Sequence, residues 1–181
     1  VGMDEMAYQL LQQRKNPSWL YSIDQGATTI WERWDSYTIE GGFNKHEWNM
    51  NSFNHYSYGA VAEWFYAGMA GIQTSDYSIT TIGKSGWKHF VLCPHIDTRP
   101  DALILAVNGE RITWARAKTR TPEGIITAKW QLKGDGRITY EVSIPQDATA
   151  TVMMPMASAD DMVLVDGQTV KDGTTIALRK H

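Results

Sequence analysis

The sequence is poor in the features that mark several classes of protein. It has one cysteine, Cys93, among 181 residues, so an intramolecular disulfide is excluded and a cysteine-based metal site is not expected. It has no run of about 18 apolar residues, the length that a transmembrane helix requires. Its 17 Lys and Arg form no basic run and are outnumbered by 20 Asp and Glu, so neither a nucleic-acid nor a membrane partner is predicted. The first residues, VGMDEMAYQ, lack a basic stretch followed by an apolar one, so no signal peptide is expected in this chain.

The residues that are abundant divide the chain into two parts. Residues 1–72 hold five of the eight Trp, six of the eight Tyr and three of the four Phe, with twice as many acidic as basic residues. Residues 73–181 are nearly balanced in charge and richer in Thr, Val and Ile. Because 43% of all residues are hydrophobic, the composition is that of a folded globular chain. We therefore predict two structurally different domains with these boundaries.

The first part has the spacing of helices. Apolar residues between 3 and 11 recur at spacings of three and four residues, which predicts a first helix. Asn16 followed by Pro17 predicts the N-terminal cap of a second, short helix. Residues 26–53 show no sustained period and are typical of a functional loop. Residues 55–72 are helical in pattern and so apolar that the helix needs neighbours on most sides. Two short helices cannot supply them, which indicates that part of this domain is missing.

The second part has the period of strands. Several short alternating runs are separated by turn signals such as Asn108-Gly109, and they predict an antiparallel β-sandwich. The expected strand runs are 87–94, 102–108, 112–122, 124–134, 137–145, 148–155, 162–167 and 174–179.

Two motifs in the first part resemble a known family. GATTIWERWDS at residues 26–36, followed by MNSFNHYSYGAVAEWFYAGMAGI at residues 50–72, is similar to the end of the catalytic domain of bacterial α-L-rhamnosidases. Downstream, GWKHFVLCPHID at 86–97 and YEVSIPQDATATVMMP at 140–155 resemble that family's C-terminal β-sandwich domain. The family's catalytic domain is an (α/α)6 barrel. The resemblance therefore implies a mixed α and β fold in separate segments, with a few helices of an incomplete barrel followed by the sandwich.

The chemistry that the resemblance implies is inverting glycoside hydrolysis. It needs two carboxyl groups roughly 6.5–9.5 Å apart, one to protonate the leaving oxygen and one to take a proton from water. The resemblance implies that Glu32, in TTIWERW, is the general base. The family's general acid lies in an acidic motif far upstream, and no such motif occurs here. From the residues alone, Glu32 fits better a carboxylate paired with Arg33 or another cation at a surface turn.

Residues near Glu32 are candidates for binding the sugar. Trp31 and Trp34 can exclude water and offer flat faces to the ring, although packing within the barrel explains them equally well. His55 resembles the family histidine that contacts rhamnose, and its alternative role is capping or packing. Glu63 is interpreted as a structural ion-pair residue, and it is the second choice, after Glu32, among the candidate carboxylates. Three residues of the intervening loop are interpreted as surface residues: His46, Glu47 and Trp48.

The first functional hypothesis is the C-terminal portion of an inverting α-L-rhamnosidase. The parent enzyme would hydrolyse terminal rhamnose, and the isolated chain is expected to be inactive because the general acid is absent. A rhamnose-containing carbohydrate is the expected partner, and no cofactor or metal is expected. The uncovered barrel face predicts self-association of the chain.

The second hypothesis is a non-catalytic β-sandwich that binds carbohydrate or braces the barrel. Its predicted strands carry Trp87, Trp114 and Trp130. Trp114 and Trp130 lie in alternating runs and can belong to the core, whereas exposed aromatic residues would favour carbohydrate binding.

Overall fold

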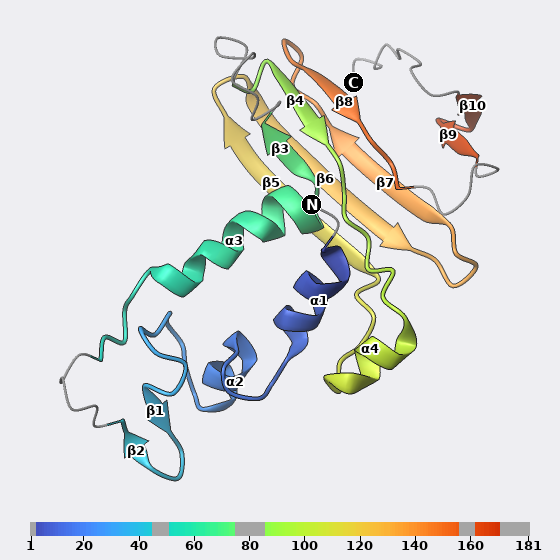
Figure 1. The fold of residues 1–181 in the computed structure, drawn as a ribbon. Helices are drawn as coiled ribbons and strands as arrows, with labels where there is room; N and C mark the ends of the chain where they lie inside the picture. The colour runs from blue at the N-terminus through green and yellow to red at the C-terminus, as the bar shows by residue number, and fades with distance from the viewer. Residues whose placement is uncertain (1–2, 45–50, 75–85, 156–161, 171–181) are drawn as a thin grey trace.

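The computed structural model describes residues 3–44, 51–74, 86–155 and 162–170 (Figure 1). Within these ranges, helices come first and small sheets follow, which confirms the predicted mixed α and β fold in this order. The closed barrel and the closed sandwich of a complete protein stay predictions.

Two helices come first in the chain. α1 (Asp4–Gln12) follows the predicted apolar spacing and has two acidic residues in its first turn, where the helix dipole favours negative charge. α2 (Trp19–Asp24) begins later than predicted. Its N-cap is Ser18, whose hydroxyl oxygen accepts the Tyr21 N–H at 3.0 Å. The prediction of Asn16 as the cap was wrong because Ser18, an equally good capping residue, stands directly before the helix.

The third helical segment passes through three helix types without a break. It consists of η1 (Ser57–Ala60, a 3-10 turn), α3 (Val61–Trp64) and η2 (Phe65–Met69, a π turn), which Figure 1 draws as one helix labelled α3. Its aromatic side chains are only partly covered, since Phe65 is 40% and Tyr66 45% exposed. Such exposure is what the sequence predicts for a helix that lacks some of its neighbours. No helix in the described ranges is both long and apolar enough to span a bilayer.

The strands form four small sheets among the described residues. Their bounds are β1 (Tyr37–Thr38), β2 (Gly42–Phe43), β3 (Ile72–Thr74), β4 (His89–Leu92), β5 (Trp114–Thr121), β6 (Gly124–Leu132), β7 (Ile138–Ser143), β8 (Thr149–Val152), β9 (Val163–Val165) and β10 (Gln168–Val170). The strands β1 and β2 pair with each other, as do β9 and β10, and the larger sheets have the orders β3-β4-β8 and β5-β6-β7. Strands β4 and β8 are parallel, contrary to the antiparallel prediction, because alternation fixes the buried face of a strand but not the direction of its neighbour. The predicted run at 174–179 lies outside the described residues.

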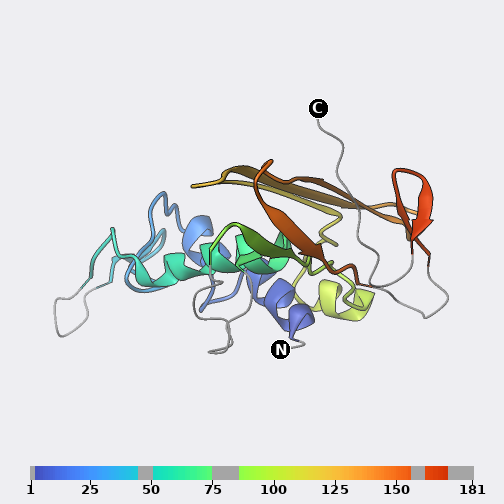
Figure 2. The same ribbon diagram turned by 90° about the horizontal axis from the view of Figure 1, so that it is seen from above.

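The two three-stranded sheets share a hydrophobic cluster. Strands β3 and β4 contribute Ile72, Phe90 and Leu92, and β6 contributes Ile126 and Ala128, all at most 4% exposed. Alternate residues of β7 pack against this cluster, as its period-two pattern predicts. Figure 2 shows the sheet of β5, β6 and β7 as an outer layer. The sheets are therefore layered around a common core.

One predicted strand is a helix. Residues 102–108 fit a strand run in the sequence, but α4 (Asp101–Ala106) is helical, with Pro100 directly before it. Proline suits the start of a helix because it has no N–H to leave unbonded. The prediction was wrong because a short apolar run without alternation is compatible with either structure.

Two tryptophans of the outer sheet lie on opposite faces. Trp130 of β6 is fully buried, whereas Trp114 of β5 is 63% exposed. The register pairs Trp130 with Ala115 and Trp114 with Gln131, so the two indoles point away from each other across the sheet. The core position is confirmed for Trp130 and was wrong for Trp114.

The sheets complete the C-terminal end of the third helical segment. The last carbonyls of a helix lack partners within it. Here the Trp130 indole N–H donates to the carbonyl of Met69 at 2.6 Å, and the Tyr140 hydroxyl donates to that of Ala70 at 3.0 Å. Gly71 then turns the chain into β3 with a φ of +80°, and a Cβ there would lie 2.3 Å from the Pro94 nitrogen. Only glycine allows both this backbone conformation and this close approach.

A buried ion pair lies where the chain leaves β4. Asp97 and Arg99 have no exposed side-chain surface, and two hydrogen bonds of 2.8 Å join them in a bidentate pair. The Ile112 N–H donates to the same carboxylate at 2.9 Å. From α1, Gln12 accepts a hydrogen bond from Arg99 at 2.7 Å, and the Tyr8 ring lies 5.6 Å from the guanidinium carbon. The pair thus joins the first helix to the sheets.

Candidate active-site segment

Two segments more than twenty residues apart in sequence lie side by side at the candidate site. The His55 N–H donates to the Ile30 carbonyl at 2.8 Å, and the Glu32 N–H donates to the Ser52 carbonyl at 2.9 Å. The Thr29 hydroxyl also donates to the Phe53 carbonyl. These bonds connect the two segments in antiparallel order. They place the TTIWE and SFNH parts of the two family-like motifs next to each other.

Glu32 is half-buried and held by the facing segment. The Ser52 N–H donates to Glu32 Oε2 at 2.8 Å, so Glu32 and Ser52 are joined through both backbone and side chain. The other carboxylate oxygen, Oε1, makes no hydrogen bond with a described residue. No ion pair joins Glu32 to a described cation, so the alternative of a surface pair with Arg33 is not supported. Among the described residues, the carboxylate is therefore oriented through Oε2 alone.

The two tryptophans beside Glu32 have different surroundings. Trp31 is 7% exposed and meets the Phe53 ring edge to face, with the centroids 5.4 Å apart. Trp34 stacks on Tyr58, with centroids 3.6 Å apart and planes 13° from parallel, and it meets Trp19 edge to face. These contacts explain how both rings are fixed. A role in sugar binding stays a prediction for each of them.

His55 stands just before η1, at the start of the third helical segment. Its ring is half-buried, stacks on Tyr56 with centroids 5.4 Å apart, and its Nδ1 accepts the Ser57 N–H at 3.4 Å. The structure therefore brings the segments of His55 and Glu32 together, while the substrate contact itself stays a prediction. Within the described ranges, no group of three or more His, Cys, Asp or Glu is arranged to hold a metal ion.

Polar residues that the sequence analysis did not single out hold the loop around this site. The Asn44 amide donates to Asp35 Oδ2 at 2.9 Å, and the Asn51 amide donates to the carbonyl of the fully buried Ser36 at 2.9 Å. Asn51 Oδ1 is buried and has no hydrogen-bond partner within the part of the chain that the structure describes. The run of asparagines in an aperiodic stretch was the available signal, because asparagine often binds nearby backbone groups in loops.

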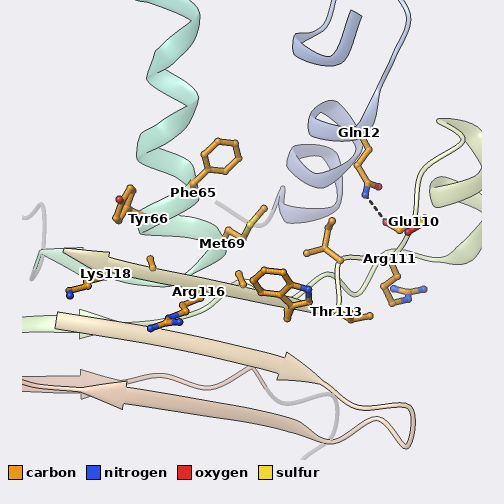
Figure 3. A pocket seen from close by; sticks show the side chains of 13 residues that line it. Gln12, Phe65, Tyr66, Met69, Glu110, Arg111, Thr113, Arg116 and Lys118 are labelled. Atoms are coloured by element: carbon orange, nitrogen blue, oxygen red, sulfur yellow. Dashed lines mark hydrogen bonds between the residues drawn. The ribbon is translucent and has the colours of Figure 1, made fainter. Parts of the chain in front are cut away.

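Other candidate residues lie elsewhere. Glu63 is on the exposed side of α3 and forms no ion pair with a described residue, contrary to its interpretation as an ion-pair residue. The loop residues His46, Glu47 and Trp48 lie outside the described ranges. A groove of about 800 Å³ lies between η2 and β5, with Phe65 and Tyr66 on one side and Arg116 and Lys118 on the other (Figure 3). None of the predicted site residues lines it.

The comparisons with known proteins match both parts of the chain in the same order. Residues 1–69 match the bacterial α-L-rhamnosidase six-hairpin glycosidase domain, and residues 79–169 match the bacterial α-L-rhamnosidase C-terminal domain. The helices are thus the end of a glycosidase domain, and the sheets are the domain that follows it. The chain belongs to the bacterial α-L-rhamnosidase family.

Individual relatives agree with this assignment. The chain is 39% identical over 178 residues to an α-L-rhamnosidase of Streptomyces avermitilis and 35% identical over 181 residues to one of Formosa agariphila. It covers 15% and 17% of their respective lengths, and they cover 97% and 100% of it. The solved α-L-rhamnosidase of Dictyoglumus thermophilum matches 95% of this chain and 16% of its own, with a TM-score of 0.71 and 28% identity. The solved α-L-rhamnosidase of Aspergillus terreus matches 88% of this chain and 15% of its own, with a TM-score of 0.63 and 29% identity.

Proposed function

We propose that this chain is the C-terminal portion of an inverting α-L-rhamnosidase that removes terminal α-L-rhamnose from glycosides or polysaccharides. Membership of the family supports the reaction class. The observation that carries the mechanism is the placement of Glu32, with one carboxylate oxygen held by the Ser52 amide and the other without a hydrogen bond to any described residue.

Glu32 acts as the general base in this proposal. The Ser52 N–H fixes the rotation of the carboxylate, so that Oε1 can accept a proton from the water that attacks the anomeric carbon. Inversion requires this water to enter opposite the leaving group, with the second carboxyl group roughly 6.5–9.5 Å away. That general acid comes from a part of the enzyme that this chain does not contain.

Trp31, Trp34 and His55 hold the sugar in the same proposal. The buried Trp31 directly precedes Glu32 in the same segment and excludes water from one side of the carboxylate. The exposed part of Trp34 offers an apolar surface to the ring and its methyl group. His55, on the adjacent segment, supplies a polar ring nitrogen for a rhamnose hydroxyl group.

The test is the substitution Glu32→Gln in the complete enzyme. Loss of a general base lowers kcat by about 10²–10⁴-fold, and KM is expected to change little. Glu141→Gln is the matched control, because that glutamate is 70% exposed on β7, in the domain that follows the glycosidase domain, and it should keep normal turnover. Full activity of the E32Q enzyme would contradict the assignment. NMR of the first product should show β-L-rhamnose, and initial α-L-rhamnose would contradict inversion.

The isolated chain lacks turnover in this proposal because it has one carboxyl group of the pair. Incubation with an aryl α-L-rhamnoside should release no aryl alcohol above the uncatalysed rate. Its uncovered rings, including Phe65 and Tyr66, also favour self-association, which sedimentation velocity over a dilution series would detect. A monomer at every concentration would contradict this second point.

A bracing role is the second candidate for the sheets. It is favoured by the hydrogen bonds that Trp130 and Tyr140 donate to the end of the third helical segment. Bracing and hydrolysis are compatible, since a supported helix holds the His55 end of the segment in place.

A further inference from the structure

The groove between η2 and β5, here called the β5 groove, has an aromatic lining that the proposed hydrolysis does not use. Trp114 of β5 is 63% exposed and lines the groove from outside the third helical segment, whose own rings Phe65 and Tyr66 are left uncovered by the missing part of the glycosidase domain. In Figure 3 the helix side chains lie on one side of the groove and the β5 side chains on the other. Exposed flat rings in a groove suit the apolar C–H faces of sugar rings, since aromatic rings combine a large apolar surface with a fixed shape.

Cations continue from this aromatic lining along the outer face of β5. Trp114, Arg116, Lys118 and Arg120 alternate with more buried residues and all face outward. Side chains on one face of a strand recur roughly every 7 Å. The three cations therefore form a row, and none of them makes an ion pair or a side-chain hydrogen bond with a described residue.

The neighbouring strand does not neutralise this row. The residues of β6 opposite the three cations are Lys129, Thr127 and Ile125. The acidic residue that β7 adds to this face, Glu141, already pairs with Lys129 at 3.2 Å. The face is therefore locally basic on a chain whose formal net charge is −3.

One acidic residue lies at the end of the β5 groove. Glu110 lines that end, its carbonyl oxygen accepts the Gln12 amide at 2.6 Å, and its carboxylate is a single negative charge against the two cations Arg116 and Lys118. Arg111 lies beside it and pairs with Asp101 at 2.7 Å. Arg116 and Lys118, which also line the groove, keep their positive charges available.

We propose that the β5 groove and the adjoining outer face of β5 bind a polyuronate, a polysaccharide chain that carries carboxylates. Trp114 stacks on a sugar ring, and Arg116, Lys118 and Arg120 pair with carboxylates along the chain. The planar guanidinium groups favour carboxylates because they can donate two parallel hydrogen bonds to each. The choice of a glycan over another polyanion rests on the proposed function. The presence of the groove and of its positive charges is observed independently of that function.

The test is calorimetric titration of the 181-residue chain with polygalacturonate. The matched ligand is fully methyl-esterified polygalacturonate, which keeps the sugar backbone and removes the charge. Binding of the acidic polymer, weakened by added salt, is expected because exposed charges are screened. No binding, or equal binding of the ester, would overturn the proposal. So would equal or tighter binding of duplex DNA or of a sulfated glycan, each of which would assign the face to another polyanion.

Matched variants locate the site. Trp114→Ala and the double variant R116Q/K118Q should each weaken binding by roughly tenfold or more. Lys88→Gln removes one positive charge from an exposed position before β4 and should leave affinity unchanged. Unaltered circular dichroism would show that the variants fold. The assignment would be overturned if both groove variants bound polygalacturonate as tightly as the natural chain does. It would also be overturned if the complete enzyme did not bind polygalacturonate. An E32Q chain should bind normally, so failure of the proposed catalytic role is distinguishable from failure of this site.

Discussion

Replacing Asp97 with asparagine tests the buried ion pair that joins α1 to the sheets. Arg99 is 1% exposed and receives its opposing charge from Asp97 through two bonds of 2.8 Å. The substitution keeps the shape of the side chain but removes its negative charge. It also replaces one acceptor oxygen by an amide N–H₂ group, which cannot accept the hydrogen bonds that Arg99 and the Ile112 N–H donate. Removing one partner of a buried pair typically costs about 3–5 kcal/mol, because the other charge stays buried without compensation. That is a large share of a total stability of about 5–15 kcal/mol.

The assay is equilibrium urea unfolding followed by tryptophan fluorescence. Asp101→Asn is the matched control, because that side chain is 86% exposed and its pair with Arg111 should contribute less than about 1 kcal/mol. The double variant D97N/R99M should recover part of the loss, since it also removes the stranded charge. Equal effects of D97N and D101N, or a double variant less stable than D97N alone, would refute the reasoning.

The same pair gives a pH dependence of known sign. Burial by itself would raise the pKa of Asp97, but hydrogen bonds from Arg99 and the Ile112 N–H, with the guanidinium charge, hold that pKa below its usual value. A lowered pKa in the folded state contributes stability that is complete above the unfolded pKa, about 3.9, and is lost as pH falls further. The difference in the free energy of unfolding between the natural chain and D97N should therefore shrink below about pH 4.

Two further substitutions test how the sheets hold the helix end. Tyr140→Phe leaves the Ala70 carbonyl without its donor and should cost about 1–3 kcal/mol of unfolding free energy, whereas the same change at Tyr56, which is 87% exposed, should cost almost nothing. Gly71→Ala should cost roughly 2–5 kcal/mol, because the new Cβ meets backbone at 2.3 Å in a conformation that disfavours alanine. Gly134→Ala is the matched control for the general effect of replacing glycine by alanine, because a Cβ at that position meets nothing within 4 Å. Equal melting temperatures within either matched pair would contradict the corresponding contact.

Strand positions were predictable from the sequence because half-buried strands repeat every two residues. The pattern along β7 fixed both the element and its buried face. It could not fix strand direction, so the parallel pairing of β4 with β8 was missed. The apolar run of α4 has no clear period, and a local choice between helix and strand depends there on its surroundings.

The candidate site was predictable only through the family resemblance. Composition and spacing near Glu32 fit a surface ion pair better than a catalytic base. The contact that orients its carboxylate comes from the backbone N–H of Ser52, which any residue except proline could supply. Trp114 was misplaced for a related reason: alternation shows that neighbouring residues of β5 face opposite ways but not which face the helices cover.

The donors that finish the third helical segment lie 61 and 70 positions further along the chain. An expressed piece that stopped at residue 72 would leave those carbonyls to water, and the last turn would fray. We therefore expect the two family domains to move together as one rigid unit. Amide hydrogens at the end of that segment should exchange with solvent only when the sheets themselves open.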